Sequence, residues 1–197
     1  MRNIADESFI AKTKSLLQFH FVDSTAILAE STPVLAAFET LIAGMSVHVS
    51  MNARLLAAGL TYFGGTGYLY AKGRDLSRLL FAVRDTTSER IQGTHDATYL
   101  GAFNLVFAPL LYAASGARNL REISIGTATA IAFGFVNGLP MGYSVDLFRD
   151  LTGLKECNRP SYPQSVKRMT PKIKLTLAVL LTAAGMAVTG GIYALKG

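Results

Sequence analysis

The chain has 197 residues, of which 50% are apolar and only 16% are charged, and its formal net charge is +6. An average soluble domain carries about 25% charged residues, and the long uncharged windows of this chain exclude a secreted domain, a Rossmann-type enzyme and a coiled coil. The basic residues lie in connecting segments and do not alternate with stacking aromatic residues, so nucleic-acid binding is not expected.

The amino-terminal segment, residues 1–22, carries charges of both signs and has no apolar stretch that ends in a small-residue cleavage site. A removable signal peptide is therefore not expected. Residues 9–22 form either an amphipathic helix at the membrane interface, before the chain turns inward, or a frayed tail.

Five apolar windows follow, at residues 24–46, 55–71, 97–117, 123–145 and 175–195, and their 105 residues contain only two charges, Glu30 and Glu39. Each window has 17 to 23 residues. At a rise of about 1.5 Å per residue, such helices match a hydrocarbon layer roughly 30 Å thick. The sequence predicts an all-α integral membrane protein with five transmembrane helices, embedded in a lipid bilayer.

The first window is the most polar. An ionised carboxylate at the bilayer centre costs about 2.5–3.5 kcal/mol, so such a group normally faces the protein interior or a cavity. Asp23 and Glu30 are seven residues apart and share a helix face, whereas Glu39 lies on the opposite face unless the helix breaks near Pro33. Glu30 and Glu39 have two interpretations. Each is either a proton carrier, because burial raises the pKa of a carboxyl group, or a group with no role in transport. In the second case it is a structural partner of Arg54 or Asn137 or, for Glu39, a carboxylate close enough to the outer interface to stay hydrated.

Helix-packing residues follow in the fourth window. Small residues recur every four positions, and such ridges let helices approach closely in lipid; the ridge is either a tight helix seam or the lining of a narrow path. It consists of Gly126, Ala130, Gly134, Gly138 and Gly142. Asn104 and Asn137 offer amides at membrane depth, for a substrate or for an interhelical hydrogen bond.

Charged residues gather at the predicted cytoplasmic helix ends as Arg74-Asp75 and Arg149-Asp150, with Asp146 one turn before the second pair. These residues either form a latch that opens during transport or anchor the helices at the lipid headgroups. The three histidines lack metal-ligand spacing and no nucleophile–base pair is present, so we expect no metal, no cofactor and no enzymatic activity.

Fifteen of the 19 Lys and Arg residues lie in the amino-terminal segment and in the segments after the second and fourth windows. This bias places the amino terminus in the cytoplasm and the carboxyl terminus outside. Cys157 is the single cysteine, so an intramolecular disulfide is impossible.

Two segments repeat a pattern. Gly67-Tyr68, five residues and Arg74-Asp75-Leu76 correspond to Gly142-Tyr143, five residues and Arg149-Asp150-Leu151, and Asp23 and Asp96 begin the two copies. We therefore predict two tandem transmembrane hairpins, 23–94 and 95–152, in the same orientation as a parallel repeat. A cytoplasmic loop, 153–174, and a fifth helix, 175–197, follow without a counterpart.

The pattern resembles the bacterial L-alanine exporter family, small inner-membrane proteins with four helices. The matching positions are Asp23, Ser24, Ala26, Glu39, Gly44-Met45-Ser46, Ser50, Arg54-Leu55 and Arg74-Asp75-Leu76, then Asp96, Asn104, Gly116-Ala117, Gly138, Gly142-Tyr143, Asp146 and Arg149. The resemblance implies export of L-alanine from a bacterial cytoplasm, driven by the proton gradient. Glu30, the fifth helix, and Leu69 and Ala71 depart from the family pattern.

Our leading hypothesis is a secondary active exporter of L-alanine or a similar small neutral amino acid, coupled to protons and assembled as a homo-oligomer. The alternative is a non-transporting membrane scaffold or assembly subunit that oligomerises through the glycine ridge. The candidates for substrate or proton contact are Asp23, Glu30, Glu39, Arg54, Asn104 and Asn137; those for gating or anchoring are Arg74, Asp75, Asp146 and Arg149.

Overall fold

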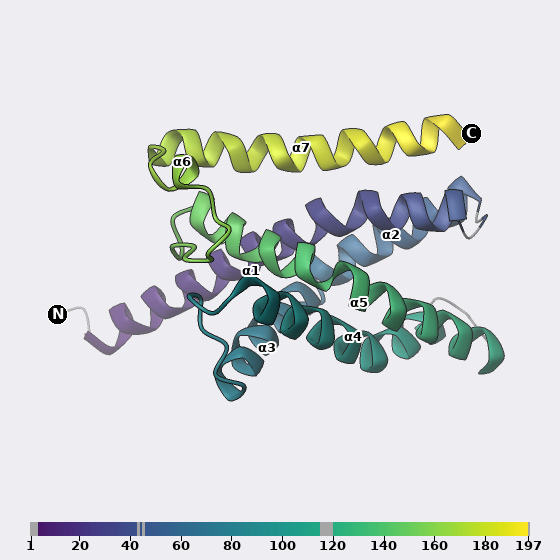
Figure 1. Cartoon of the computed structure of the whole chain (residues 1–197), viewed down its shortest axis with the longest axis horizontal. Helices are drawn as coiled ribbons and strands as arrows, with labels where there is room; N and C mark the ends of the chain where they lie inside the picture. The colour runs from purple at the N-terminus through teal and green to yellow at the C-terminus, as the bar shows by residue number, and fades with distance from the viewer. Residues whose placement is uncertain (1–3, 43, 45, 115–119, 197) are drawn as a thin grey trace. The chain divides into compact units, whose positions relative to one another are not determined.

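The computed structural model describes residues 4–42, 44, 46–114 and 120–196, and no strand occurs in these ranges. The elements are α1 (Ile4–Ala37), a π-helical turn η1 (Phe38–Ile42), α2 (Val47–Tyr62), α3 (Thr66–Leu80), α4 (Glu89–Ala114), α5 (Leu120–Leu151), α6 (Gln164–Lys167) and α7 (Pro171–Lys196) (Figure 1). The predicted all-α class is confirmed for this part of the chain. Three positions that carry the family resemblance, Met45 and Gly116-Ala117, lie outside the described residues.

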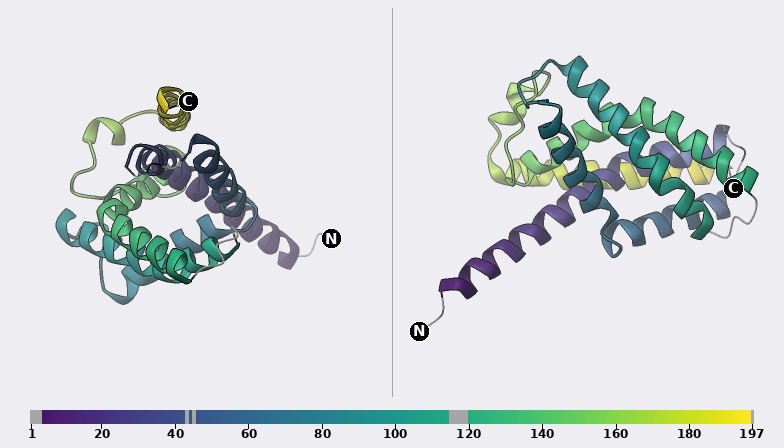
Figure 2. Two further views of the ribbon diagram at one scale, coloured as in Figure 1. Left: turned by 90° about the vertical axis from the view of Figure 1, so that its right-hand side faces the viewer. Right: turned by 90° about the horizontal axis from the view of Figure 1, so that it is seen from below.

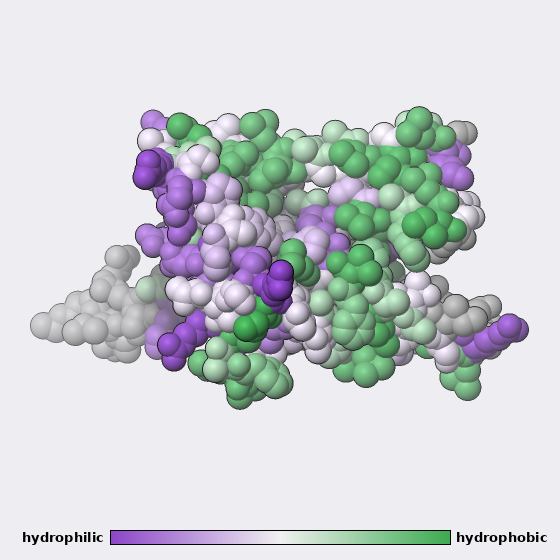
Figure 3. Space-filling view, in the orientation of Figure 1, coloured by the Kyte–Doolittle hydropathy of each residue, from purple (hydrophilic) through white to green (hydrophobic). Residues whose placement is uncertain are grey.

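Two segments in the described ranges are long and apolar enough to cross a membrane, Ala11–Ile42 and Pro171–Lys196. They contain nearly all of the first predicted window and the whole of the fifth. The three windows between them also lie largely in helices, and their crossing of a membrane remains a prediction. The outward surface of α7 is apolar along most of its length (Figure 3). The exposed apolar side chains include Ile173, Leu175, Val179, Leu180, Met186, Val188 and Leu195.

The second window, 55–71, is not one helix as predicted. α2 ends at Tyr62 and α3 begins at Thr66. Gly64 and Gly65 separate them, and Gly65 has a φ of +72°, a left-handed conformation that ends helices and that glycine adopts without a steric penalty. A single apolar window in the sequence therefore corresponds to two helices joined by a turn.

For residues 9–22, the structure contains the helix, which is one of the two predicted alternatives. Residues 9–22 are helical rather than a frayed tail, and α1 continues from them through Pro33 to Ala37. The irregularity comes later, in η1, where one π-helical turn replaces the α-helical pattern and carries Glu39. π-turns inside helices are rare and often occur at functional sites.

The chain divides into two compact units. Unit 1 contains Met1–Ala71, Ser144–Cys157 and Pro163–Gly197, and unit 2 contains Lys72–Tyr143 and Asn158–Tyr162. Within unit 1, α7 lies along α1. A Cβ on Gly185 of α7 would lie 2.5 Å from the carbonyl oxygen of Ala29, so the absence of a side chain permits this close approach.

Within unit 2, α4 and α5 pack as antiparallel neighbours (Figure 2). A Cβ on Gly134 would lie 2.9 Å from the backbone nitrogen of Gly101, and one on Gly138 would overlap the backbone of Ala97. One on Gly142 would overlap the carboxylate of Asp96. This part of the small-residue ridge therefore faces α4. Gly126 lies farther up α5, and its surroundings are outside the described part of the structure.

Candidate functional site

Glu39 is the centre of a polar cluster in unit 1. Its Oε1 accepts a hydrogen bond from Arg54 Nη2 at 2.6 Å, and its Oε2 accepts one from Ser50 Oγ at 2.6 Å. The Ser50 hydroxyl lies 3.0 Å from the hydroxyl of Tyr193. The cluster thus joins three helical segments, η1, α2 and α7.

Local sequence explains how α2 contributes two groups. Ser50 and Arg54 are four residues apart, so they lie on the same face of that helix. The Glu39 and Arg54 side chains are only 12% and 14% exposed. Arg54 Nε is buried and has no acceptor among the described residues. A carboxylate beside a guanidinium that retains an unused N–H is complementary to a molecule carrying both an ammonium and a carboxylate group.

A second charge pair in unit 1 joins α1 to the end of α5. Arg149 donates from Nε to Asp23 Oδ1 at 2.7 Å and from Nη2 to Oδ2 at 2.8 Å. Both side chains are almost completely buried, and the ring of Phe19 lies 5.3 Å from the guanidinium carbon. Two parallel hydrogen bonds from one guanidinium give a rigid and specific pairing.

Unit 2 contains a larger cluster of charges around Asp96. Arg78 donates to both carboxylate oxygens, from Nε at 3.0 Å and from Nη2 at 2.5 Å, and Arg159 donates to Oδ2 at 2.6 Å. His95 Nδ1 lies 3.2 Å from Oδ1, and its Nε2 lies 2.9 Å from the hydroxyl of Ser77. Asp96 is therefore held from several directions.

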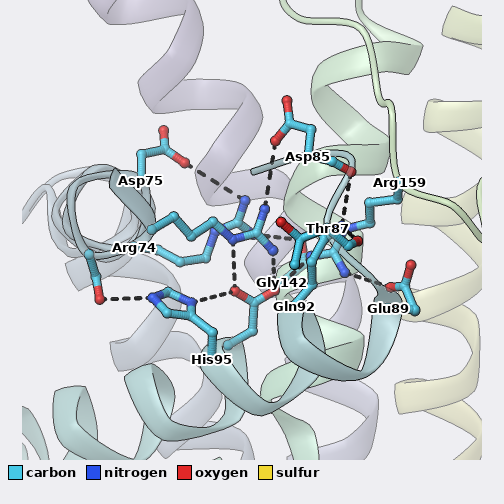
Figure 4. Close-up of polar contacts among 12 residues, drawn as sticks. Arg74, Asp75, Asp85, Thr87, Glu89, Gln92, His95, Gly142 and Arg159 are labelled. Atoms are coloured by element: carbon cyan, nitrogen blue, oxygen red, sulfur yellow. Dashed lines mark hydrogen bonds and ion pairs between the residues drawn. The ribbon is translucent and has the colours of Figure 1, made fainter. Parts of the chain in front are cut away.

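The outer part of this cluster ties further segments together (Figure 4). Arg74 donates to the carbonyl oxygen of Gly142 at 2.5 Å and lies 3.7 Å from Asp75. Arg159 also donates to Glu89 at 2.8 Å, which attaches the short segment Asn158–Tyr162 to the start of α4.

The Asp96 carboxyl, which lies just before the apolar window 97–117, has a displaced pKa. Burial raises this pKa, but the hydrogen bond with His95 and the charges of Arg74 and Arg78 together lower it by more. The resulting pKa is about 2, against an ordinary value of 3.8. Asp96 is thus an ionised structural anchor at neutral pH.

These contacts bear on the candidates at the helix ends. Arg74 and Arg149 are 0% and 1% exposed. Both guanidinium groups therefore contact protein groups, while the latch and the anchoring interpretations both remain predictions. Each aspartate that begins a predicted repeat copy faces an arginine of the other copy, since Asp23 pairs with Arg149 and Asp96 lies in the field of Arg74. The repeat itself remains a prediction.

The remaining candidates lie on α4, α5 and α1. Asn104 donates to the carbonyl oxygen of Ala130 at 2.6 Å, which is an interhelical hydrogen bond within unit 2. Asn137 and Asp146 are buried on α5, and Glu30 is half-buried on α1. A cavity of about 590 Å³ opens between the first half of α1 and residues 152–154, but no candidate residue lines it.

Several contributors to the clusters are not among the candidates predicted from the sequence, including Arg78, Tyr193 and Arg159. Arg78 lies four residues after Arg74, and this spacing indicates a shared helix face directed toward Asp96. Tyr193 carries a hydroxyl near the end of the last apolar window, which also contains three threonines, so this hydroxyl does not stand out in the sequence. Arg159 reaches its partners from a loop, and no local pattern indicates that contact.

No family model, curated protein or solved structure matches the chain.

Proposed function

We propose that this chain is a multi-pass protein of the bacterial inner membrane that exports L-alanine or a similar small neutral amino acid in exchange for protons. The observation that carries the proposal is the Glu39–Arg54 pair, because its carboxylate belongs to a segment, Ala11–Ile42, that is long and apolar enough to cross a membrane. The resemblance to the L-alanine exporter family supports the same function, since Glu39, Ser50 and Arg54 belong to its pattern.

The pair matches the charges of a neutral amino acid. The Glu39 carboxylate would bind the ammonium group of the substrate, and Arg54 would bind its carboxylate. Both protein charges would then exchange one partner for another, so that neither is left unpaired in a medium where an isolated charge costs several kcal/mol. An apolar pocket would offer neither the ammonium group nor the carboxylate of the substrate a charged partner.

Proton coupling follows from the same carboxylate. Protonation of Glu39 removes its charge, weakens its hold on both Arg54 and the ammonium group, and favours release. A ligand or proton shifts a conformational equilibrium only by its different affinity for the two states. The proposal assigns that difference to Glu39 between inward-open and outward-open states, with Glu30 as the second candidate for the proton.

The glycine ridge, on which the scaffold alternative depends, is partly covered by another helix of the same chain. Gly134, Gly138 and Gly142 pack against α4 of the same chain, so this stretch of the ridge does not present a free face to a partner. A homo-oligomer, which we retain in the proposal, would have to form through another surface, such as the exposed apolar side chains of α7.

Uptake of labelled amino acids into inverted membrane vesicles tests the function. Export in the cell becomes uptake in this geometry. We expect saturable uptake of alanine that rises when the vesicle interior is acidified. Glu39→Gln keeps the size of the side chain but removes its charge and replaces one acceptor oxygen with a donor group. It should abolish the dependence on the proton gradient while the protein still inserts.

Glu156→Gln is the matched control, because the same chemical change falls on an exposed residue outside the charge clusters. It should leave uptake unchanged. Proton-dependent alanine uptake that persists in Glu39→Gln would contradict the mechanism. A wild-type protein that transports none of the amino acids tested would favour a scaffold.

A further inference from the structure

The helix that the family resemblance does not explain, α7, contacts the rest of unit 1 at three levels. Near its start, Lys174 Nζ contacts Asp150 Oδ2 at 2.7 Å. In its middle, Gly185 allows close approach to the backbone of α1 at Ala29. Near its end, Tyr193 reaches the hydroxyl of Ser50. The first two contacts hold the helix in place, and the third joins the proposed substrate site.

The hydrogen-bond inventory fixes the direction of that third contact. A serine hydroxyl has one hydrogen to donate and two lone pairs. The hydrogen of Ser50 is committed to Glu39 Oε2 at 2.6 Å, because the ionised carboxylate can only accept. The Tyr193 hydroxyl therefore donates to Ser50, and the chain of hydrogen bonds runs from Tyr193 through Ser50 to Glu39.

Such a chain orients the carboxylate. Ser50 and Arg54 each hold one carboxylate oxygen, and each successive hydrogen bond polarises and strengthens the next in a medium of low dielectric constant. Without the Tyr193 hydroxyl, Ser50 loses the donor that faces its lone pair and the polarisation that this donor supplies, so its hydrogen bond to Glu39 becomes weaker.

We infer that α7 supplies a positioning residue to the substrate site: Tyr193 acts through Ser50 to hold the Glu39 carboxylate where the ammonium group of a zwitterionic amino acid binds. This inference rests on the proposed function and adds a role for the fifth helix.

The test is the Tyr193→Phe variant, which removes one hydroxyl and retains the ring. For alanine uptake into inverted vesicles, the apparent KM should rise by about threefold to tenfold, as expected for the loss of one ordinary hydrogen bond. The maximal rate per inserted protein should stay the same, because the ring still packs and α7 is still held by Lys174 and Gly185. Ser50→Ala should give a rise at least as large.

The double variant Tyr193→Phe with Ser50→Ala distinguishes positioning from independent contacts. Because Tyr193 acts through Ser50, the double variant should have the KM of Ser50→Ala alone, and additive effects would contradict the chain. The matched control is Tyr62→Phe, which removes a hydroxyl that contacts Thr25 Oγ1 at 2.8 Å in the same unit, and it should leave the KM unchanged.

An unchanged KM in Tyr193→Phe, whether or not the amount of inserted protein falls, would overturn the inference and leave Tyr193 as a packing residue. That result is distinct from failure of the proposed function, in which the wild-type protein itself would transport no amino acid and the inference would fall with it.

Discussion

Buried arginines are the most informative residues of this chain, because each must be paired to remain buried. Arg149 has both oxygens of Asp23, and Arg78 has both oxygens of Asp96. Breaking such a pair by removing one partner typically costs about 3–5 kcal/mol, since the other charge is left uncompensated. The free energy of unfolding therefore depends strongly on these few side chains.

Acid should weaken the folded state through Asp96. Its pKa in the folded chain is about 2, below the ordinary 3.8, so the ionised carboxylate stabilises the fold above the ordinary value and this contribution is lost as the pH falls from about 4 to 2. The difference corresponds to about 2 kcal/mol. We expect the melting temperature of the detergent-purified protein to fall over that range.

In Asp96→Asn the stabilisation should be absent at every pH, so the variant should be destabilised at pH 6 and lose less of its remaining stability between pH 4 and 2. Asp85→Asn is the control, because Asp85 lies 4.0 Å from Arg78 and is partly exposed, and such pairs contribute about 0–1 kcal/mol. An acid transition in Asp96→Asn equal to that of the wild type would assign the acid sensitivity to other carboxylates.

At the scale of the elements, glycine determines how closely helices approach. A Cβ at position 138 would overlap the backbone of Ala97, which cannot rotate out of the way as a side chain can. Gly138→Ala should therefore force α4 and α5 apart and destabilise the protein by about 1–3 kcal/mol, as overpacking does. Thermal unfolding in detergent measures this change.

Gly59→Ala is the opposite case. Gly59 lies inside α2, and a Cβ there would meet nothing within 4 Å. The same substitution should raise stability by up to about 1 kcal/mol, because alanine favours the helix over the unfolded chain. Equal effects of the two variants would show that backbone approach does not decide the outcome.

The elements also show what a sequence can and cannot predict. Apolar windows and small-residue spacing depend on composition and helical period, so helicity and the ridge from Gly134 to Gly142 could be predicted. The turn at Gly64-Gly65 could not be separated from an apolar run by hydropathy. The π-turn at Glu39 was missed because Pro33 offered a nearer cause for an irregularity, yet α1 continues through it.

The candidate site could be predicted only where partners lie on recognisable patterns. Glu39 and Arg54 are both candidates on sequence grounds, and their pairing is one of the interpretations that the sequence allows. Tyr193 is 143 residues from Ser50 in the chain, and only tertiary packing of α7 brings the two hydroxyls together. The same holds for Arg159 and Asp96, which are 63 residues apart.

At the scale of the whole molecule, the arrangement of charge along the sequence predicts the orientation in a membrane. Fifteen of the 19 Lys and Arg residues fall in three segments that alternate with the other connections. Positive charges near the ends of membrane helices are retained in the cytoplasm. The proposed topology therefore places the loop 153–174 inside the cell and the carboxyl terminus outside, with α7 as the last crossing.

Cysteine labelling tests this topology in a Cys157→Ser background, which removes the single native cysteine. Lys196→Cys lies at the end of α7 and Glu156→Cys in the predicted cytoplasmic loop. In cells with a permeabilised outer membrane, a maleimide that cannot cross the inner membrane should label Lys196→Cys but not Glu156→Cys. In inverted vesicles, the same reagent should label Glu156→Cys but not Lys196→Cys. Both positions label from the same side if α7 lies along the membrane surface or outside the bilayer, and that result would contradict a five-helix topology. Labelling from opposite sides would show that α7 crosses the membrane, because among the described residues Pro171–Lys196 is the only helix between the two positions that is long enough to cross.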